Sequence, residues 1–196
     1  MNHVITISRE FGSGGREIGQ QLAEQLKIPF YDKELITLAA QDCSMTEELL
    51  NHFDERFLRS FHPVPRFSLF GCYQQPITDQ VYLAQRKVIR QLADNGPCVI
   101  VGRCANHILE KKAVNLFIHA DMNSRIRRKE AMGIPVSESS MEQHIRSVDK
   151  IRKRYYEHHT DQRWGDAARY QLCVDTTDIG INGAVKTILC YLSFLD

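Results

Sequence analysis

The hydrophobic pattern of the chain alternates between short apolar runs and longer segments with helical spacing. The short runs are rich in Val and Ile, which is typical of buried strands. They lie at 4–7, 28–32, 98–101, 114–119 and 172–175. In the longer segments the apolar side chains recur every three or four positions, which predicts amphipathic helices. These segments lie at 18–26, 33–42, 44–58, 77–95, 106–112, 124–132, 139–158 and 181–195. The alternation predicts an α/β fold, with a parallel sheet covered by helices on both faces.

Local signals mark several of these boundaries. Ser44-Met45-Thr46-Glu47 and Ser139-Ser140-Met141-Glu142 match the capping-box pattern, in which Glu follows Ser by three residues at a helix start. Gly96 is expected to end the helix at 77–95. Residues 59–76 are rich in proline and aromatic side chains without a regular period, and we interpret them as a mobile, partly apolar flap.

The first strand is followed by Gly12, Gly14 and Gly15, and then by a helix that carries Ile18 on its apolar face. Glycine adopts positive φ at low cost and lets an anion approach the backbone closely. The helix N-terminus adds unpaired N–H groups and about half a positive charge. This arrangement predicts a phosphate cradle at residues 12–18.

Three interpretations of the glycine loop stay open. In a Walker A alignment, G-x-x-x-x-G-K-[S/T], Gly15-Arg16 replaces Gly-Lys, Glu10 replaces the first glycine, and Glu17 takes the hydroxyl position. The dinucleotide fingerprint G-x-G-x-x-G fits less well because it requires glycine where Glu17 stands. The third interpretation is a tight turn that packs helix on strand and binds no ligand.

Size and charge narrow the function classes. The 196 residues fit one domain, and the formal net charge of +1 gives no global basic field for nucleic acid or an anionic membrane. The six cysteines are scattered, with no C-x-x-C pair, so we expect no disulfide framework and a cytoplasmic location. We expect no signal peptide, because the apolar run at 4–7 fits a strand, and the late run at 187–195 is too short to cross a bilayer.

Several polar side chains follow the predicted strands. Because ligands bind at the carboxyl ends of parallel strands, we expect the glycine loop, Asp32, Arg103, the region of Asp121 and Asp175 to lie along one edge of the sheet. This edge is the candidate site.

The chain resembles the nucleoside monophosphate kinases, and most closely the cytidylate kinase-like family of P-loop proteins. The resemblance rests on ISREFGSGGREIG (7–19), PFYDKELI (29–36), VIVGRCANHIL (99–109), NLFIHADMNSRIRRK (115–129), VDKIRKRYYEHHT (148–160) and WGDAARYQLCVDTT (164–177). It implies a three-layer P-loop kinase fold in a single domain over 1–196. Within it, 44–97 would be a helical acceptor-binding segment and 121–137 a helical lid.

The resemblance also implies a reaction and its residues. ATP with Mg²⁺ would give its γ-phosphoryl group to a small acceptor, most simply a nucleoside monophosphate such as CMP. The donor phosphates would be bound by the loop, namely Gly12, Ser13, Gly14, Gly15, Arg16, Glu17 and Ile18. Arg16 would reach the β- and γ-phosphates, and Arg125 and Arg128 would act on the transferred group. The acceptor would be bound by Asp32, Arg103, Asp149 and Arg152.

Structural alternatives accompany these roles. Residues 125–129 also fit a solvated helix face, Asp149 and Arg152 an i,i+3 surface pair, and Asp32 a helix cap. Tyr155, Tyr156, His158 and His159 show no metal-ligand spacing and fit aromatic packing, and Trp164 fits a packing anchor.

The chain also departs from the family pattern. Arg16 and Glu17 replace the expected lysine and hydroxyl residue, and Val101 and Cys104 stand where cytidylate kinases carry carboxylates. Magnesium ligands and the oligomeric state therefore stay unassigned. Two other functions remain: a non-catalytic nucleotide-binding regulator, and a kinase of a different small molecule.

Overall fold

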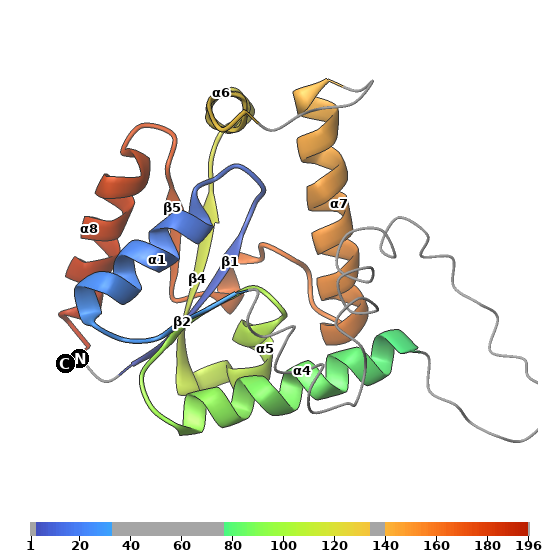
Figure 1. The fold of residues 1–196 in the computed structure, drawn as a ribbon, viewed down its shortest axis with the longest axis vertical. Helices are drawn as coiled ribbons and strands as arrows, with labels where there is room; N and C mark the ends of the chain where they lie inside the picture. Colours follow the sequence, from blue (N-terminus) through green and yellow to red (C-terminus); the bar gives the residue numbers. More distant parts are fainter. Residues whose placement is uncertain (1–2, 33–76, 134–139, 196) are drawn as a thin grey trace, which may run out of the picture.

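The computed structural model describes residues 3–32, 77–133 and 140–195 (Figure 1). The predicted helices at 33–42 and 44–58 and the predicted flap at 59–76 lie outside the described residues. So does most of the predicted helix break at 133–135.

The centre of the molecule is a parallel sheet of five strands, as the sequence predicts. Its strands are β1 (Val4–Arg9), β2 (Phe30–Tyr31), β3 (Val99–Val101), β4 (Ala113–His119) and β5 (Leu172–Asp175). The spatial order is β2-β3-β1-β4-β5. In the middle of the sheet, Ile5 pairs with Val99 on one side and Val114 on the other.

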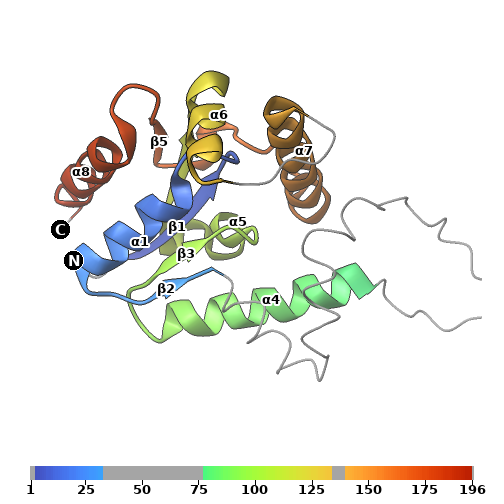
Figure 2. The ribbon, with the colours of Figure 1, turned by 45° about the horizontal axis from the view of Figure 1, so that its top comes forward.

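Helices cover both faces of this sheet (Figure 2). One face carries α1 (Gly15–Leu26) and α8 (Gly180–Leu192). The other carries α4 (Ile77–Asp94), α5 (Ala105–Leu109) and α7 (Met141–Thr160). The helix α6 (Met122–Ala131) follows β4 at the carboxyl ends of the strands. Two short 3₁₀ turns, η2 (Glu110–Lys112) and η3 (Ala167–Arg169), precede β4 and β5.

Each face has its own apolar core. On the first face, Leu22 of α1 and Ile188 of α8 pack over Ile7 and Leu116 of the sheet, and all four are almost fully buried. On the second face, α4, α5 and α7 contribute side chains that include Ile89, Ile108 and Tyr156. The two cores make the three predicted layers, helix, sheet and helix. No helix in the described part of the chain is both long and apolar enough to cross a membrane.

Aromatic packing supports the second face. Trp164 meets Phe117 edge to face, with ring centroids 5.6 Å apart, so its interpretation as a packing anchor is confirmed. Tyr156 is buried, and its hydroxyl accepts a hydrogen bond from Asn106 Nδ2 at 2.9 Å.

The predicted start of α7 is wrong by one residue. Its N-cap is Ser140 and not Ser139, and Gln143 takes the place expected for Glu142. Ser140 Oγ accepts from the Gln143 N–H at 3.3 Å, while Gln143 Oε1 accepts from the Ser140 N–H at 3.2 Å. Glutamine makes the same reciprocal pair as glutamate, so the box shifts by one position.

The strand order places the glycine loop at the edge where parallel sheets of this kind commonly bind ligands. The chain leaves β1 in the middle of the sheet, and its neighbours β3 and β4 lie on opposite sides of it. In such sheets the crevice beyond the carboxyl ends of the strands, at the point where the order reverses, is the binding site. The glycine loop begins at that point.

Candidate functional site

The glycine loop is the short connection between Arg9, the last residue of β1, and Gly15, the first residue of α1. Gly12 and Gly14 have φ of +83° and +87°, which only glycine adopts at low cost. The loop is also crowded, because a Cβ atom at Gly14 would lie 2.9 Å from Ile181 Cγ1. The N-cap residue of α1 is Gly14, which has no side chain to accept a hydrogen bond. The cap residue therefore leaves the N–H groups of the first turn without a side-chain acceptor.

Hydrogen bonds from three parts of the fold fix the loop. Ser13 Oγ donates to the carbonyl of Glu10 at 2.9 Å, and Thr176 Oγ1, after β5, donates to the carbonyl of Ser13 at 2.8 Å. The Phe11 N–H donates to Asp149 Oδ1 of α7 at 2.7 Å. The protein alone therefore holds the loop in shape, which reduces the ordering cost of binding a ligand.

Arg125 of α6 is the most deeply buried cation at this edge, with a side chain 5% exposed. It pairs with Asp149 Oδ2 and, at 3.2 Å, with Glu10 Oε2. Its Nε donates to the Phe11 carbonyl at 2.7 Å. Burial raises the pKa of Glu10 even though Arg125 opposes this shift. The predicted catalytic Arg125 therefore lies in a buried ion cluster that joins the loop, α6 and α7.

Arg128 and Lys129 extend from the same helix over the loop. Arg128 Nη1 donates to the Gly12 carbonyl at 2.5 Å, and its Cζ lies 3.6 Å from where a Cβ of Gly14 would be. Lys129 Nζ lies 4.6 Å from the centre of the Phe11 ring. Burial lowers the pKa of Lys129; Glu17 opposes this, and Arg152 and Arg128 add to it. These arginine and lysine side chains surround the loop with positive charge.

On the other side of the loop, Asp32 pairs with two arginines. Arg16 Nε donates to Asp32 Oδ2 at 2.8 Å, and Arg9 Nη2 lies 3.9 Å from Asp32 Oδ1. The Arg16 side chain is 49% exposed and that of Asp32 is 15% exposed. The guanidinium group of Arg9 lies directly over Gly102 after β3. Asp32 therefore links β2 to β1 and α1, and the helix after it lies outside the described residues.

The turn after β3 carries Arg103 in a constrained backbone. Gly102, Arg103 and Cys104 have φ of +85°, +54° and +57°. Non-glycine residues in the left-handed region cost of order 1–3 kcal/mol and concentrate at functional sites. Arg152 of α7 approaches the same edge, where its Nη1 donates to the Arg9 carbonyl at 3.1 Å. Burial lowers the pKa of Arg152, whereas Asp149 and Asp32 raise it.

The expected edge therefore brings most of the predicted site residues close to the glycine loop. Asp121 and Asp175 have local roles, since Asp121 caps α6 and Asp175 accepts from the Thr177 N–H at 2.9 Å. Arg9 is the member of the site that the sequence analysis did not name. Glu10 was named in the Walker A alignment, and Lys129 as part of the basic helix at 124–132. The sequence does contain an indication for Arg9. If Gly14-Gly15 rather than Gly15-Arg16 is aligned with the Gly-Lys of the Walker A motif, Arg9 takes the position of the first glycine.

The site fits a polyphosphate better than a metal ion. Glycine backbone, a helix N-terminus and arginine side chains are the groups that bind phosphate. In a Walker A motif the Ser or Thr after the lysine binds Mg²⁺ through its hydroxyl. Here that position is Glu17 if Gly15-Arg16 is aligned with Gly-Lys, or Arg16 if Gly14-Gly15 is, and neither residue carries a hydroxyl. Glu10, Asp32 and Asp149 each pair with arginine. The described residues thus do not form a Walker-type magnesium site.

Comparison with known proteins identifies related sequences and folds. Residues 4–178 match the model of the cytidylate kinase-like family. None of the curated proteins compared with the chain is significantly similar to it.

Among solved structures, an uncharacterized protein from Eubacterium ventriosum ATCC 27560 is 26% identical, with a TM-score of 0.69 over 97% of this chain and 98% of its own. Shikimate kinase from Bacteroides thetaiotaomicron is 12% identical, with a TM-score of 0.60 over 98% and 99%. A gluconokinase from Sinorhizobium meliloti 1021 is 14% identical, with a TM-score of 0.58 over 98% and 93%. The last two share the fold, a parallel sheet between helices as in P-loop kinases.

Proposed function

The chain belongs to the cytidylate kinase-like family, and on that premise we propose that it transfers the γ-phosphoryl group of ATP to a small acceptor. A nucleoside monophosphate such as CMP is the first candidate for that acceptor. Phosphoryl transfer needs little covalent chemistry from the protein, because catalysis comes from positioning and from stabilising charge on the transferred group. The side chains at the carboxyl edge of the sheet suit that task.

One observation carries the proposal: a rigid glycine loop at the point where the strand order reverses, with cationic side chains around it. The loop and the first turn of α1 offer backbone N–H groups to the donor phosphates. Arg128 and Lys129 approach from α6, while Arg103 and Arg152 approach from the turn after β3 and from α7. We assign the first pair to the donor phosphates and the second pair to the acceptor phosphate.

We assign the task of the Walker lysine to Arg9. A Cβ atom at Gly15, the first residue of α1, would lie 2.6 Å from Arg9 Cβ. A lysine at position 15 would therefore need the space that Arg9 fills. Arg16 is held by Asp32 at 2.8 Å and Arg9 more loosely at 3.9 Å, so the expected contact of Arg16 with the β- and γ-phosphates requires it to leave the tighter pair. Arg9 supplies a permanent positive charge with several donors.

Magnesium is expected to enter with ATP, where it neutralises charge between the β- and γ-phosphates. It commonly keeps several water ligands and needs few protein ligands. No step of the transfer is assigned here to a metal bound by the protein.

The test is ADP formation from ATP and Mg²⁺ with a panel of acceptors: CMP, dCMP, UMP, AMP and GMP, with shikimate and gluconate as non-nucleotide acceptors. We expect turnover with one nucleoside monophosphate and at least a 100-fold loss in Arg9→Ala. The double variant Arg9→Gly/Gly15→Lys, which restores the first glycine and the lysine of the Walker pattern, should recover activity that Gly15→Lys alone lacks.

Arg146→Ala is the matched control, because Arg146 is exposed and, among the described residues, forms its ion pair with Glu142 one turn away in α7. Turnover with shikimate or gluconate alone would assign the chain to another kinase class. ATP hydrolysis that no acceptor stimulates would contradict the proposed transfer.

A nucleotide-binding regulator is the second candidate. It is favoured by one specific observation: Glu10, Asp32 and Asp149 are each paired with arginine. These three carboxylates are engaged with arginine, so none of them is an evident base or metal ligand. ATP binding without turnover on the whole panel would select this candidate.

A further inference from the structure

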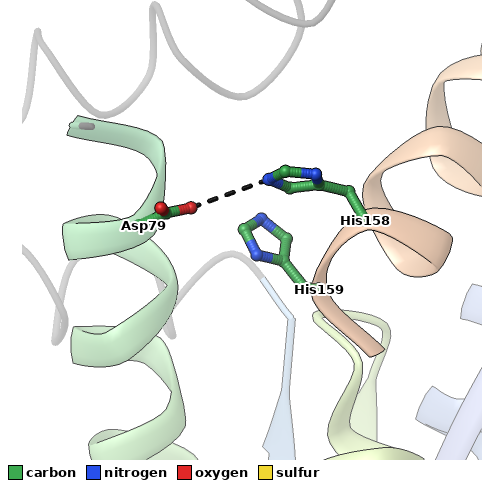
Figure 3. A group of neighbouring side chains, drawn as sticks. All are labelled: Asp79, His158 and His159. Atoms are coloured by element: carbon green, nitrogen blue, oxygen red, sulfur yellow. Dashed lines mark ion pairs between the residues drawn. The ribbon is translucent and has the colours of Figure 1, made fainter. Parts of the chain in front are cut away.

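A cluster of metal-ligating side chains lies away from the candidate site, where the amino end of α4 meets the carboxyl end of α7 (Figure 3). Asp79 comes from the first turn of α4, and His158 and His159 come from the last turn of α7. The two helices also touch beside the cluster, since Tyr155 Oη donates to Gln85 Oε1 at 2.8 Å. Nothing in the proposed phosphoryl transfer uses these three residues.

The geometry of the cluster is close to that of a metal site. One carboxylate oxygen of Asp79 and one ring nitrogen of each histidine all lie within 4.8 Å of one another. Asp79 Oδ1 and His158 Nε2 are 3.7 Å apart. In tetrahedral Zn²⁺ coordination, bonds of about 2.0–2.1 Å place the ligand atoms about 3.4 Å apart. A shift of roughly 1 Å in the ring nitrogen of His159 would therefore bring the three ligand atoms to the spacing of a zinc site.

The surroundings hold His159 in place. Its ring stacks on Tyr82 with centroids 4.2 Å apart and an angle of 7°, and the edge of Tyr155 packs against it at 4.6 Å. In Figure 3 a ring nitrogen of His159 faces the Asp79–His158 pair. That nitrogen is the atom that would bind a metal.

Access and chemistry point to one class of ion. The side chains of His158 and Asp79 are 47% and 38% exposed, so an ion reaches them directly from solvent. Two imidazoles and one carboxylate form a ligand set that binds Zn²⁺ and leaves a position for water. Mg²⁺ prefers oxygen ligands in an octahedral site and does not suit two imidazoles.

We propose that Asp79, His158 and His159 bind a Zn²⁺ ion that joins the amino end of α4 to the carboxyl end of α7. The ion links side chains that are about 80 positions apart in the sequence, Asp79 of α4 and His158 of α7. The helix α4 belongs to the segment 44–97 that was predicted to bind the acceptor, so the ion would join this helix to α7. The site does not depend on the proposed phosphoryl transfer.

The test is calorimetric titration of the full chain, freed of metal with a chelator, with Zn²⁺ alone. We expect one ion per chain with a Kd of about 10 μM or lower. Asp79→Asn and His158→Ala should each weaken binding at least tenfold. His119→Ala is the matched control. His119 Nδ1 lies 3.9 Å from Asp175, and both side chains are exposed, as in the His158–Asp79 pair. His119 and Asp175 are the last residues of β4 and β5, and neither belongs to the cluster.

A measurement on the wild type alone complements the variants. Zn²⁺ at 100 times its Kd should raise the Tm by roughly 5–10 °C, whereas Mg²⁺ at the same concentration should leave it unchanged. Absence of stoichiometric binding would overturn the proposal. So would equal affinities of the wild type, Asp79→Asn and His158→Ala, or an equal loss of affinity in His119→Ala.

Discussion

Arg125 joins three parts of the candidate site through one side chain. It pairs with Glu10 of the loop and Asp149 of α7, and it donates to the Phe11 carbonyl from α6. A loop that must keep its N–H groups aimed at a ligand needs such support. We therefore propose that Arg125 positions the loop, while Arg128 is the arginine of α6 that donates to the Gly12 carbonyl.

Removal of Arg125 tests this positioning role. In Arg125→Ala, Glu10 and Asp149 lose their partner, and the free energy of unfolding should fall by about 3 kcal/mol because two partly buried carboxylates are left uncompensated. Chemical denaturation measures the change. Arg127→Ala, an exposed neighbour in α6, should stay within about 0.5 kcal/mol of the wild type.

A triple variant separates charge from packing. Arg125→Ala/Glu10→Gln/Asp149→Asn removes the unpaired charges, so it should be more stable than Arg125→Ala alone. A triple variant at least as destabilised as the single one would show that the ion cluster is not what Arg125 contributes.

Residue by residue, the sequence predicted where polar groups gather but not how they pair. Asp32, Arg103 and Arg152 meet at the expected edge because each is fixed relative to a strand end or helix face. The Arg16–Asp32 pair was missed because it joins the first turn of α1 to the residue after β2, and no periodic pattern links those elements. The cluster of Asp79, His158 and His159 was missed for the same reason.

At the scale of elements, α6 depends on its first residues. Asp121 is its N-cap and accepts the Ser124 N–H at 2.9 Å, while its own N–H donates to Thr177 Oγ1 at 2.9 Å. Hydrogen bonds from Ser124 lower the pKa of Asp121 from 3.8 to about 2. The cap thus holds the amino end of the helix that carries Arg125, Arg128 and Lys129.

The sign of the resulting pH effect follows from the lowered pKa. The unfolded chain takes up a proton near pH 4 while the folded chain stays ionised to about pH 2, so the ionised cap stabilises the fold above pH 4 and this contribution disappears between pH 4 and 2. Asparagine caps helices without charge. The stability of the wild type relative to Asp121→Asn should therefore be constant near neutral pH and decrease on acidification through that window. A difference that is independent of pH from 7 to 2 would contradict this role.

The predicted elements were confirmed wherever the period was clear, and their ends were less certain. For four elements the predicted ends agree with the observed ends to within a few residues. These are the strands predicted at 98–101 and 172–175, observed as β3 and β5, and the helices predicted at 18–26 and 77–95, observed as α1 and α4. The box at Ser139 was wrong because Ser139 and Ser140 both have a suitable partner three residues later, and sequence alone does not separate Glu142 from Gln143. The helix at 106–112 ends as α5 at Leu109 and continues as the turn η2.

At the scale of the whole molecule, the positive potential is local. The formal net charge is only +1, yet Arg9, Arg103, Arg128, Lys129 and Arg152 converge on one edge of the sheet. Glu10, Asp32 and Asp149 offset part of this charge, and the cations in excess attract anionic ligands without making the entire protein basic. The fold creates this edge because parallel strands end on the same side, which is why fold class and edge were both predictable from the sequence.

The arrangement within that edge needed the three-dimensional fold. The sequence suggested that Gly15-Arg16 takes the Gly-Lys position, and this alignment stays a prediction. The alternative alignment puts Arg9 in the motif, but its candidacy for the lysine's task comes from its Cβ, which lies next to the position that a side chain at residue 15 would occupy. Such proximity depends on how β1 turns into α1, which no spacing in the sequence reveals.

Calorimetric titration of the wild-type chain with ATP, AMP and adenosine tests most directly whether the loop after β1 binds phosphate. If the loop and its arginines bind phosphate, ATP should bind at least 100-fold more tightly than adenosine, with AMP in between, and salt should weaken ATP binding most. Equal affinities for ATP and adenosine, or no binding of ATP, would contradict phosphate binding by the loop. The glycine loop would then be a turn that packs α1 on the sheet.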